Sequence, residues 1–169
     1  PMILTRDIIQ KEIDDGRIRI SPFDEDALGP ASLDLTLGDT IRVYPEGGRR
    51  VPVKEGTDFH GITERREIQE GYVMRPGELV LGITREHITL PPDICGWLNS
   101  RSRFARLGLM VHITSPFMQP GIANHQVLEI YNASPYDLEL MPGERLCQFV
   151  FQYCEGQAEY KGRYREQAL

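Results

Sequence analysis

The stretch Ser32-Leu-Asp-Leu-Thr-Leu37 alternates strictly between polar and apolar residues, and its leucines fall on one face. Such alternation is typical of a β-strand that buries one side. Moving outward, apolar runs separated by Gly, Pro or Asn predict further strands at 41–44, 72–74, 79–83, 94–98, 109–114, 127–132, 138–140 and 147–152. Many short strands with regular turns indicate a mainly β protein, either a barrel or a sandwich.

Upstream of this stretch, residues 5–15 predict one clear helix. Thr5 is a candidate N-cap, Asp7 lies in the first turn, and Gly16 follows the last turn. The apolar stripe of this helix consists of Ile8, Ile9 and Ile13.

Two polar segments carry no core pattern. Residues 49–70 are expected to form a long loop or hairpin. Residues 156–167 are expected to form a polar tail that is either free or docked on a neighbouring subunit.

The composition limits the class of protein. A chain of 169 residues favours a single domain with a hydrophobic core. The net charge of −6 argues against a general nucleic-acid binder, which would show a basic face. The absence of a leader and of a long apolar run predicts a cytoplasmic protein that does not span a membrane. Three cysteines without C-x-x-C spacing predict reduced thiols and no zinc site.

The positive charge gathers in Ser100-Arg-Ser-Arg-Phe-Ala-Arg106, which Gly108 follows closely. We expect a short helical turn near 101–107, in which Ser102 and Arg106 share one face. Free backbone N–H groups beside guanidinium groups are suited to phosphate. Most charge runs are instead solvated surface, and Arg103 faces either solvent or a neighbouring subunit.

About twenty residues later, Glu129 interrupts the apolar run Val127-Leu-Glu-Ile-Tyr131. A carboxylate is expensive to bury, so such a residue usually has a partner or a chemical task. Two interpretations follow. Glu129 either pairs with Arg106 to hold the fold together, or acts on a nucleotide that the arginine turn binds.

Five segments together resemble the dCTP deaminase branch of the dUTPase-like family: residues 30–38, 100–112, 127–132, 140–148 and 160–167. The resemblance runs nearly end to end and in the same order. It implies a distorted β-barrel of the dUTPase-like (β-clip) type over residues 1–169, with residues 156–169 as a C-terminal arm closing over the active site. It also implies a homotrimer whose active sites are shared between subunits.

The resemblance further implies hydrolytic deamination of dCTP to dUTP and ammonia, which feeds dUMP and dTTP synthesis. The zinc-deaminase signature is absent, so a protein base must activate the water. Glu129 would be that base, while Ser102 and Arg106 would orient it and stabilise the adduct. Mg²⁺ is expected to bind through the triphosphate and not through protein side chains, and dTTP is a candidate feedback inhibitor. The expected substrate-binding residues are Arg101, Ser102, Arg103, Phe104, Ala105, Arg106, Thr114, Ser115, Gln119, Val127, Leu128, Glu129, Tyr160, Arg163 and Gln167.

One position departs from the family pattern. The turn reads Phe117-Met-Gln-Pro-Gly121, and Gln119 stands where the family usually has an aspartate. An amide can bond a sugar hydroxyl but cannot take a proton from water. This disfavours a first alternative, a dUTP diphosphatase or a bifunctional deaminase and diphosphatase.

A second alternative is a non-catalytic, nucleotide-binding regulatory trimer. Of the histidines, His112 is expected in strand register, where it would orient the strand beside the base pocket. No role is assigned to His125.

Overall fold

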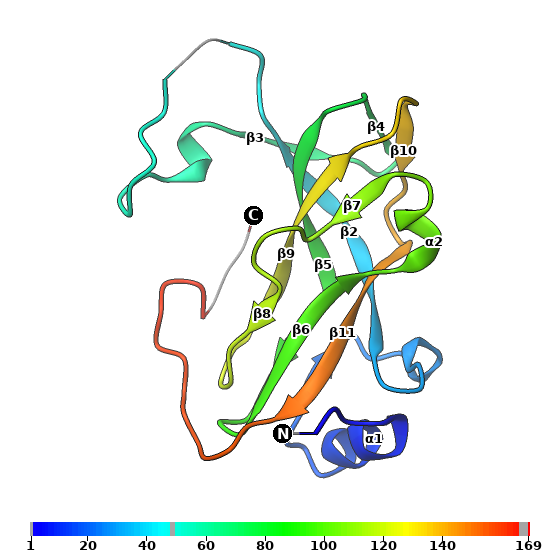
Figure 1. The fold of residues 1–169 in the computed structure, drawn as a ribbon, viewed down its shortest axis with the longest axis vertical. Helices are drawn as coiled ribbons and strands as arrows, with labels where there is room; N and C mark the ends of the chain where they lie inside the picture. Colours follow the sequence, from blue (N-terminus) through cyan, green and yellow to red (C-terminus); the bar gives the residue numbers. More distant parts are fainter. Residues whose placement is uncertain (1, 48–49, 166–168) are drawn as a thin grey trace.

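The computed structural model describes residues 2–47, 50–165 and 169 and is mainly β (Figure 1). Its helical elements are α1 Arg6–Asp14, η1 Glu25–Ala27, η2 Phe59–Gly61 and α2 Ser102–Ala105. Its strands are β1 Arg19–Ser21, β2 Leu33–Val43, β3 Glu64–Glu67, β4 Tyr72–Met74, β5 Leu79–Thr89, β6 Ile94–Ser100, β7 Leu109–Val111, β8 Phe117–Met118, β9 Ala123–Asn132, β10 Leu138–Leu140 and β11 Arg145–Tyr153.

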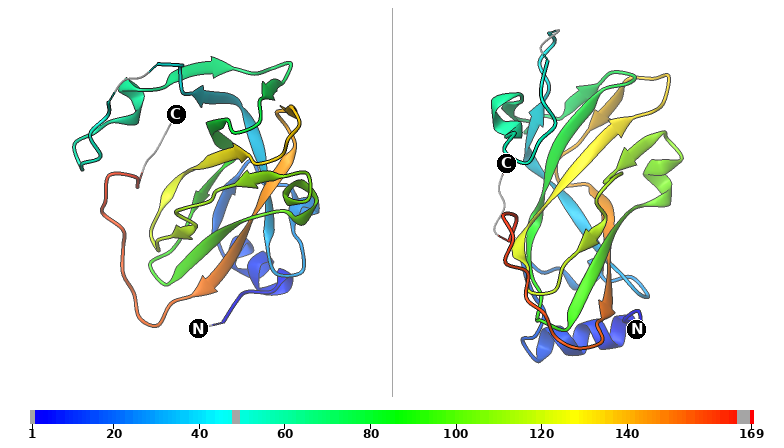
Figure 2. Two further views of the ribbon diagram at one scale, coloured as in Figure 1. Left: turned by 45° about the horizontal axis from the view of Figure 1, so that its top comes forward. Right: turned by 60° about the vertical axis from the view of Figure 1, so that its left-hand side comes forward.

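Within the described residues, one large sheet has the strand order β7-β9-β5-β2-β11-β6-β8, with β1 beside β5 and β3 beside β2. Strands β4 and β10 form a separate pair. The large sheet curls on itself, and the segment after β2 and the C-terminal segment extend along one side of it (Figure 2). The predicted mainly β, barrel-like fold is confirmed.

The alternating stretch 32–37 lies in a strand that buries one face, as predicted. Leu33, Leu35 and Leu37 are buried on one face of β2, between strands β11 and β5. The runs 32–37 and 41–44 belong to one strand, whose pairing with β5 shifts register between Leu37 and Ile41. Gly38 lies in this irregularity, where a Cβ would come within 3.0 Å of the Ile83 carbonyl oxygen.

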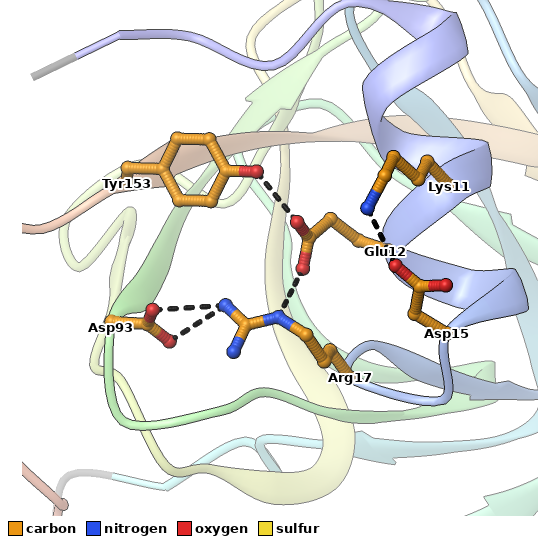
Figure 3. Close-up of polar contacts among 6 residues, drawn as sticks. All are labelled: Lys11, Glu12, Asp15, Arg17, Asp93 and Tyr153. Carbon is orange, nitrogen blue, oxygen red and sulfur yellow. Dashed lines mark hydrogen bonds and ion pairs between the residues drawn. The ribbon is translucent and has the colours of Figure 1, made fainter.

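Helix α1 covers one end of the barrel, and Ile9 is its fully buried residue of the predicted stripe. Its N-cap differs from the expectation: the Thr5 hydroxyl donates to the Asp7 side chain and makes no capping bond to the backbone. Glu12 is buried and accepts hydrogen bonds of 2.6 Å from both Arg17 and Tyr153 (Figure 3). Because Tyr153 ends β11, this cluster ties α1 to the point where the C-terminal arm begins.

Strands β1, β3 and β8 were not predicted. β1 and β8 are three and two residues long, and all four β3 side chains are exposed, so none of these strands shows an apolar alternation. The predicted strand 109–114 ends at Val111, because His112 adopts a left-handed backbone with φ 57°. The sequence had suggested that His112 is in strand register, and this prediction is wrong.

Residues 154–165 follow the outside of the barrel as an extended arm (Figure 1). The sequence predicted an arm that is free or docked on a neighbour, whereas here it packs along its own chain. The Tyr160 N–H, for example, donates to the Pro120 carbonyl at 3.0 Å. Among the described helices, none is long and apolar enough to cross a membrane.

Candidate active site

A cavity of about 610 Å³ lies against the face shared by β5 and β9. Its far wall comes from residues after β2, around η2, and from the arm. This volume is in the range of small-molecule sites. The lining residues are Tyr44, Phe59, His60, Leu81, His112, Ser115, Phe117, Met118, Gln119, Ile122, Asn124, Val127, Glu129, Tyr160, Arg163 and Tyr164.

Glu129 faces this cavity from β9. Alternation along the strand sends Leu128 and Ile130 into the core and turns Val127 and Glu129 the other way. The Glu129 side chain is therefore 29% exposed, not buried as the sequence suggested. Burial, and next the Glu129 carboxylate, raise the pKa of Tyr44 above its usual value. A carboxylate in a recessed, mostly apolar cavity is suited to proton transfer.

His112 lies directly beside Glu129. Its Nε2 donates to the Ser115 carbonyl at 2.6 Å, and its backbone N–H donates to the Glu129 carbonyl at 2.7 Å. Its Nδ1 is buried without a hydrogen-bond partner among the described residues and lies 3.7 Å from Glu129 Oε2. A carbonyl oxygen can only accept, so the proton of a neutral His112 is on Nε2 and Nδ1 presents a lone pair. This separation is longer than a hydrogen bond, so Nδ1 and the carboxylate face each other without one.

Thr114 completes the surroundings of the carboxylate. Its hydroxyl donates to Glu129 Oε2 at 3.5 Å. The left-handed backbone at His112 turns the chain after β7, so that residues 112–115 pass across the end of the carboxylate. Glu129 therefore meets one imidazole and one hydroxyl from the same turn.

The arginine turn forms as predicted, with Arg101 as N-cap of α2, Arg106 as C-cap, and Gly108 at φ 86°. Ser102, Arg103, Ala105 and Arg106 are exposed, while Phe104 packs against the core. The Arg101 guanidinium lies 3.1 Å from Asp34 and donates to the Arg145 carbonyl at 2.8 Å. Burial raises the pKa of Asp34, and the charge of Arg101 opposes that shift.

The structure brings together only part of the predicted site. Ser115, Gln119, Val127, Glu129, Tyr160 and Arg163 line the cavity, and Thr114 contacts Glu129. The Leu128 side chain lies in the core, so only its backbone could meet a ligand. Gln167 lies outside the described residues.

The α2 residues are not part of this cavity. They lie on the opposite side of the barrel from the arm in every view (Figures 1 and 2). The predicted pairing of Glu129 with Arg106 does not occur within one chain: the described partners of Glu129 are His112 and Thr114. The α2 turn and the Glu129 cavity are therefore two separate candidate half-sites of one chain.

Several lining residues were not predicted, among them Tyr44, the stacked pair Phe59 and His60, and Asn124. Phe59 and His60 lie in the polar segment 49–70, where no periodic pattern marks them. Asn124 occupies a buried position of β9, and a buried amide inside a strand was the available signal. Within the described part of the chain, no group of three or more His, Cys, Asp or Glu residues could hold a metal ion.

Two solved structures share the fold. A dCTP deaminase from Agrobacterium tumefaciens aligns with a TM-score of 0.71 at 23% identity, covering 88% of this chain and 47% of that chain, so this chain spans about half its length. The dUTPase of Staphylococcus bacteriophage 80alpha aligns with a TM-score of 0.52 at 13% identity, covering 88% of this chain and 97% of that chain. The fold is therefore of the dUTPase-like class.

Sequence relatives narrow this class. A family model described as dCTP deaminase-like matches residues 3–154. A dCTP deaminase of Alteromonas mediterranea is 38% identical over 165 residues, which cover 91% of this chain and 83% of the relative. A protein of Parafrankia sp. named "dCTP deaminase, dUMP-forming" is 37% identical over 175 residues, 98% of this chain and 87% of the relative. The chain belongs to the dCTP deaminase-like family.

Proposed function

We propose that this protein deaminates dCTP hydrolytically to dUTP and ammonia without zinc. The observation that carries the proposal is the Glu129 carboxylate, which faces a nucleotide-sized cavity beside the orphaned Nδ1 of His112. Relatives named dCTP deaminase support the substrate. A reaction on free deoxynucleotides also favours the cytoplasm.

Deamination needs a water molecule activated at C4 of cytosine and a proton delivered to N3. The water oxygen adds to C4 while Glu129 takes one water proton and passes it to N3. Glu129 then carries the remaining hydroxyl proton to the amine, and the C4–N bond breaks to release ammonia. His112 Nδ1 and the Thr114 hydroxyl hold the carboxylate in place and keep its proton within reach. Ser102 and Arg106 stabilise the charge of the tetrahedral adduct.

The two half-sites imply an oligomer. Ser102 and Arg106 do not line the Glu129 cavity of their own chain, so in this proposal they act on a base near Glu129 from another copy of the chain. A closed ring satisfies every half-site at once. We propose the homotrimer that the family resemblance implies, with each cavity completed by α2 of a neighbour and closed by the arm, Gln167 included.

The identity of Gln119 decides which product we expect. Gln119 lines the cavity and places an amide, not a carboxylate, at that position. Glu129 is the one carboxylate among the described lining residues, and it is committed to the cytosine end. We therefore expect dUTP, not dUMP, although several relatives are named dUMP-forming. We propose that dTTP, the candidate feedback inhibitor, binds in the same cavity.

The test is incubation with dCTP and Mg²⁺, with ammonia, dUTP, dUMP and pyrophosphate resolved. Equal ammonia and dUTP support the proposal. Stoichiometric pyrophosphate would instead support the bifunctional alternative, and binding without ammonia would support a regulatory protein.

Metal removal is a second test. EDTA should impair turnover because Mg²⁺ neutralises the triphosphate, whereas a zinc-selective chelator should not. Activity that a zinc chelator abolishes and zinc restores would contradict the proposed mechanism.

A further inference from the structure

The arm is fastened to its own barrel along its whole described length. The Cys154 and Ala158 N–H groups donate to the carbonyls of Asp93 and Pro92 at 2.8 and 2.9 Å. Farther along, the Ala123 N–H donates to the Arg165 carbonyl at 3.3 Å. These contacts join backbone groups, so substitution of a side chain does not remove them.

Asn124 adds a contact of a different kind. Its side-chain Nδ2 donates to the Tyr164 carbonyl at 2.6 Å, and the Asn124 residue is only 3% exposed. The hydrogen bond is therefore part-buried, since its donor is shielded while Tyr164 is exposed. Asn124 and Tyr164 both line the cavity that Glu129 faces.

A second amide holds Asn124 in this orientation. Gln126 Nε2 donates to Asn124 Oδ1 at 2.7 Å, which leaves Asn124 Nδ2 directed to the arm. Gln126 is fully buried, and its backbone N–H donates to the Thr84 hydroxyl at 2.9 Å. Its Oε1 has no hydrogen-bond partner among the described residues. A buried unpaired oxygen is unfavourable, so this amide pair is not explained by stability alone.

We propose that Asn124 is a positioning residue for the arm, and that Gln126 orients it. The amide pair fixes the Tyr164 carbonyl, and thereby places Arg163 and Tyr160 over the cavity of the same chain. The lid and the base then belong to one subunit. The kinetic consequence rests on the proposed function, but the placement of the arm does not.

Limited trypsin digestion measures the placement directly. Lys161, Arg163 and Arg165 are exposed cleavage sites in the arm. In Asn124→Ala we expect cleavage at these sites to be about fivefold faster, the effect of losing one part-buried hydrogen bond. Cleavage at Arg65 and Arg66, which lie in β3, is the internal control and should not change.

Gln126→Leu provides a second variant, since leucine fills a buried site of similar volume and removes the unpaired oxygen. It should fold, and its arm should be cleaved faster than the parent's but more slowly than that of Asn124→Ala. This variant decides the question if Asn124→Ala does not fold.

Steady-state kinetics with dCTP then test the consequence. Both variants should raise KM more than they lower kcat, because the arm closes on bound nucleotide and leaves Glu129 in place. Arm cleavage unchanged in both variants would overturn the proposal. If the parent protein does not deaminate dCTP, the proposed function fails, while the cleavage result still decides the role of Asn124.

Discussion

The arginine turn and the Glu129 cavity solve opposite physical problems. Ser102, Arg103 and Arg106 are exposed, and the residue beside them, Arg101, is tied to Asp34. Glu129 lies in a recess between an imidazole and a hydroxyl. A phosphate-binding turn needs free donors at the surface, whereas a base needs a site from which water can be excluded.

The two regions also differ in how they can be completed. The cavity takes Glu129 and the arm residues Tyr160, Arg163 and Tyr164 from one chain, but no α2 residue lines it. The arginine turn has exposed donors, and the carboxylate beside it, Asp34, is already paired with Arg101. Under the proposed function, one chain supplies two complementary halves of a site, and catalysis depends on how copies assemble.

Removing the base should have the largest effect. Glu129→Gln keeps the shape of the side chain but no basicity, and loss of a general base costs ~10²–10⁴-fold in rate. We expect kcat for dCTP deamination to fall by that factor while nucleotide binding, measured by calorimetry, is kept. Turnover within about threefold of the parent would show that Glu129 is not the general base of the reaction.

Breaking the arginine turn should come next. Arg106→Ala should lower kcat/KM for dCTP by about 10²-fold, because a donor to the developing charge is lost. The exposed Arg66→Ala in β3 removes the same charge elsewhere and should have little effect. An equal fall of kcat/KM in both variants would mean that Arg106 contributes only to the overall charge of the protein.

Substitution of His112 sharpens the description of the cavity. Asn tolerates the left-handed backbone at this position, so His112→Asn should fold. It cannot share a proton with Glu129. We expect kcat to fall roughly tenfold, less than the ~10²-fold cost of a misplaced catalytic group.

The pH dependence separates proton sharing from a structural role of His112. If the imidazole shares the Glu129 proton, the acidic limb of the pH–kcat profile should move in His112→Asn. A lower kcat with an unchanged profile would mean that His112 only supports the turn.

Gln119→Asp should have the smallest effect and changes another residue that lines the same cavity. The new carboxylate can polarise water near the phosphates, so trace dUMP and pyrophosphate should accompany dUTP. Ion-exchange chromatography of the products would show this. Abundant dUMP from the parent protein would mean that another group already performs this task.

The sequence predicted the strands that bury one face, because alternation such as that of residues 32–37 records burial directly. It also located α2 through Gly108 and the arginines. It missed β3, whose four exposed side chains show no alternation. It also missed Phe59 and His60, which line the cavity from the segment after β2.

The site was harder to predict than the fold. Its residues could be named, but the sequence did not show that Arg106 lies outside the cavity that Glu129 lines, since strand order is a tertiary property. It placed Glu129 in the core because neighbouring residues are apolar, although alternation turns it outward. The left-handed His112 was also hidden, as β-like patterning continued to Thr114.

Complementation between two inactive variants tests the shared site most directly. Glu129→Gln and Arg106→Ala, carrying different tags, are expressed together, and mixed oligomers are purified through both tags. In every mixed trimer one site in three takes Glu129 from one variant and Arg106 from the other and is intact, so the purified mixed trimers should show about a third of the parent activity. Mixed oligomers as inactive as either variant alone would contradict an active site built from two chains.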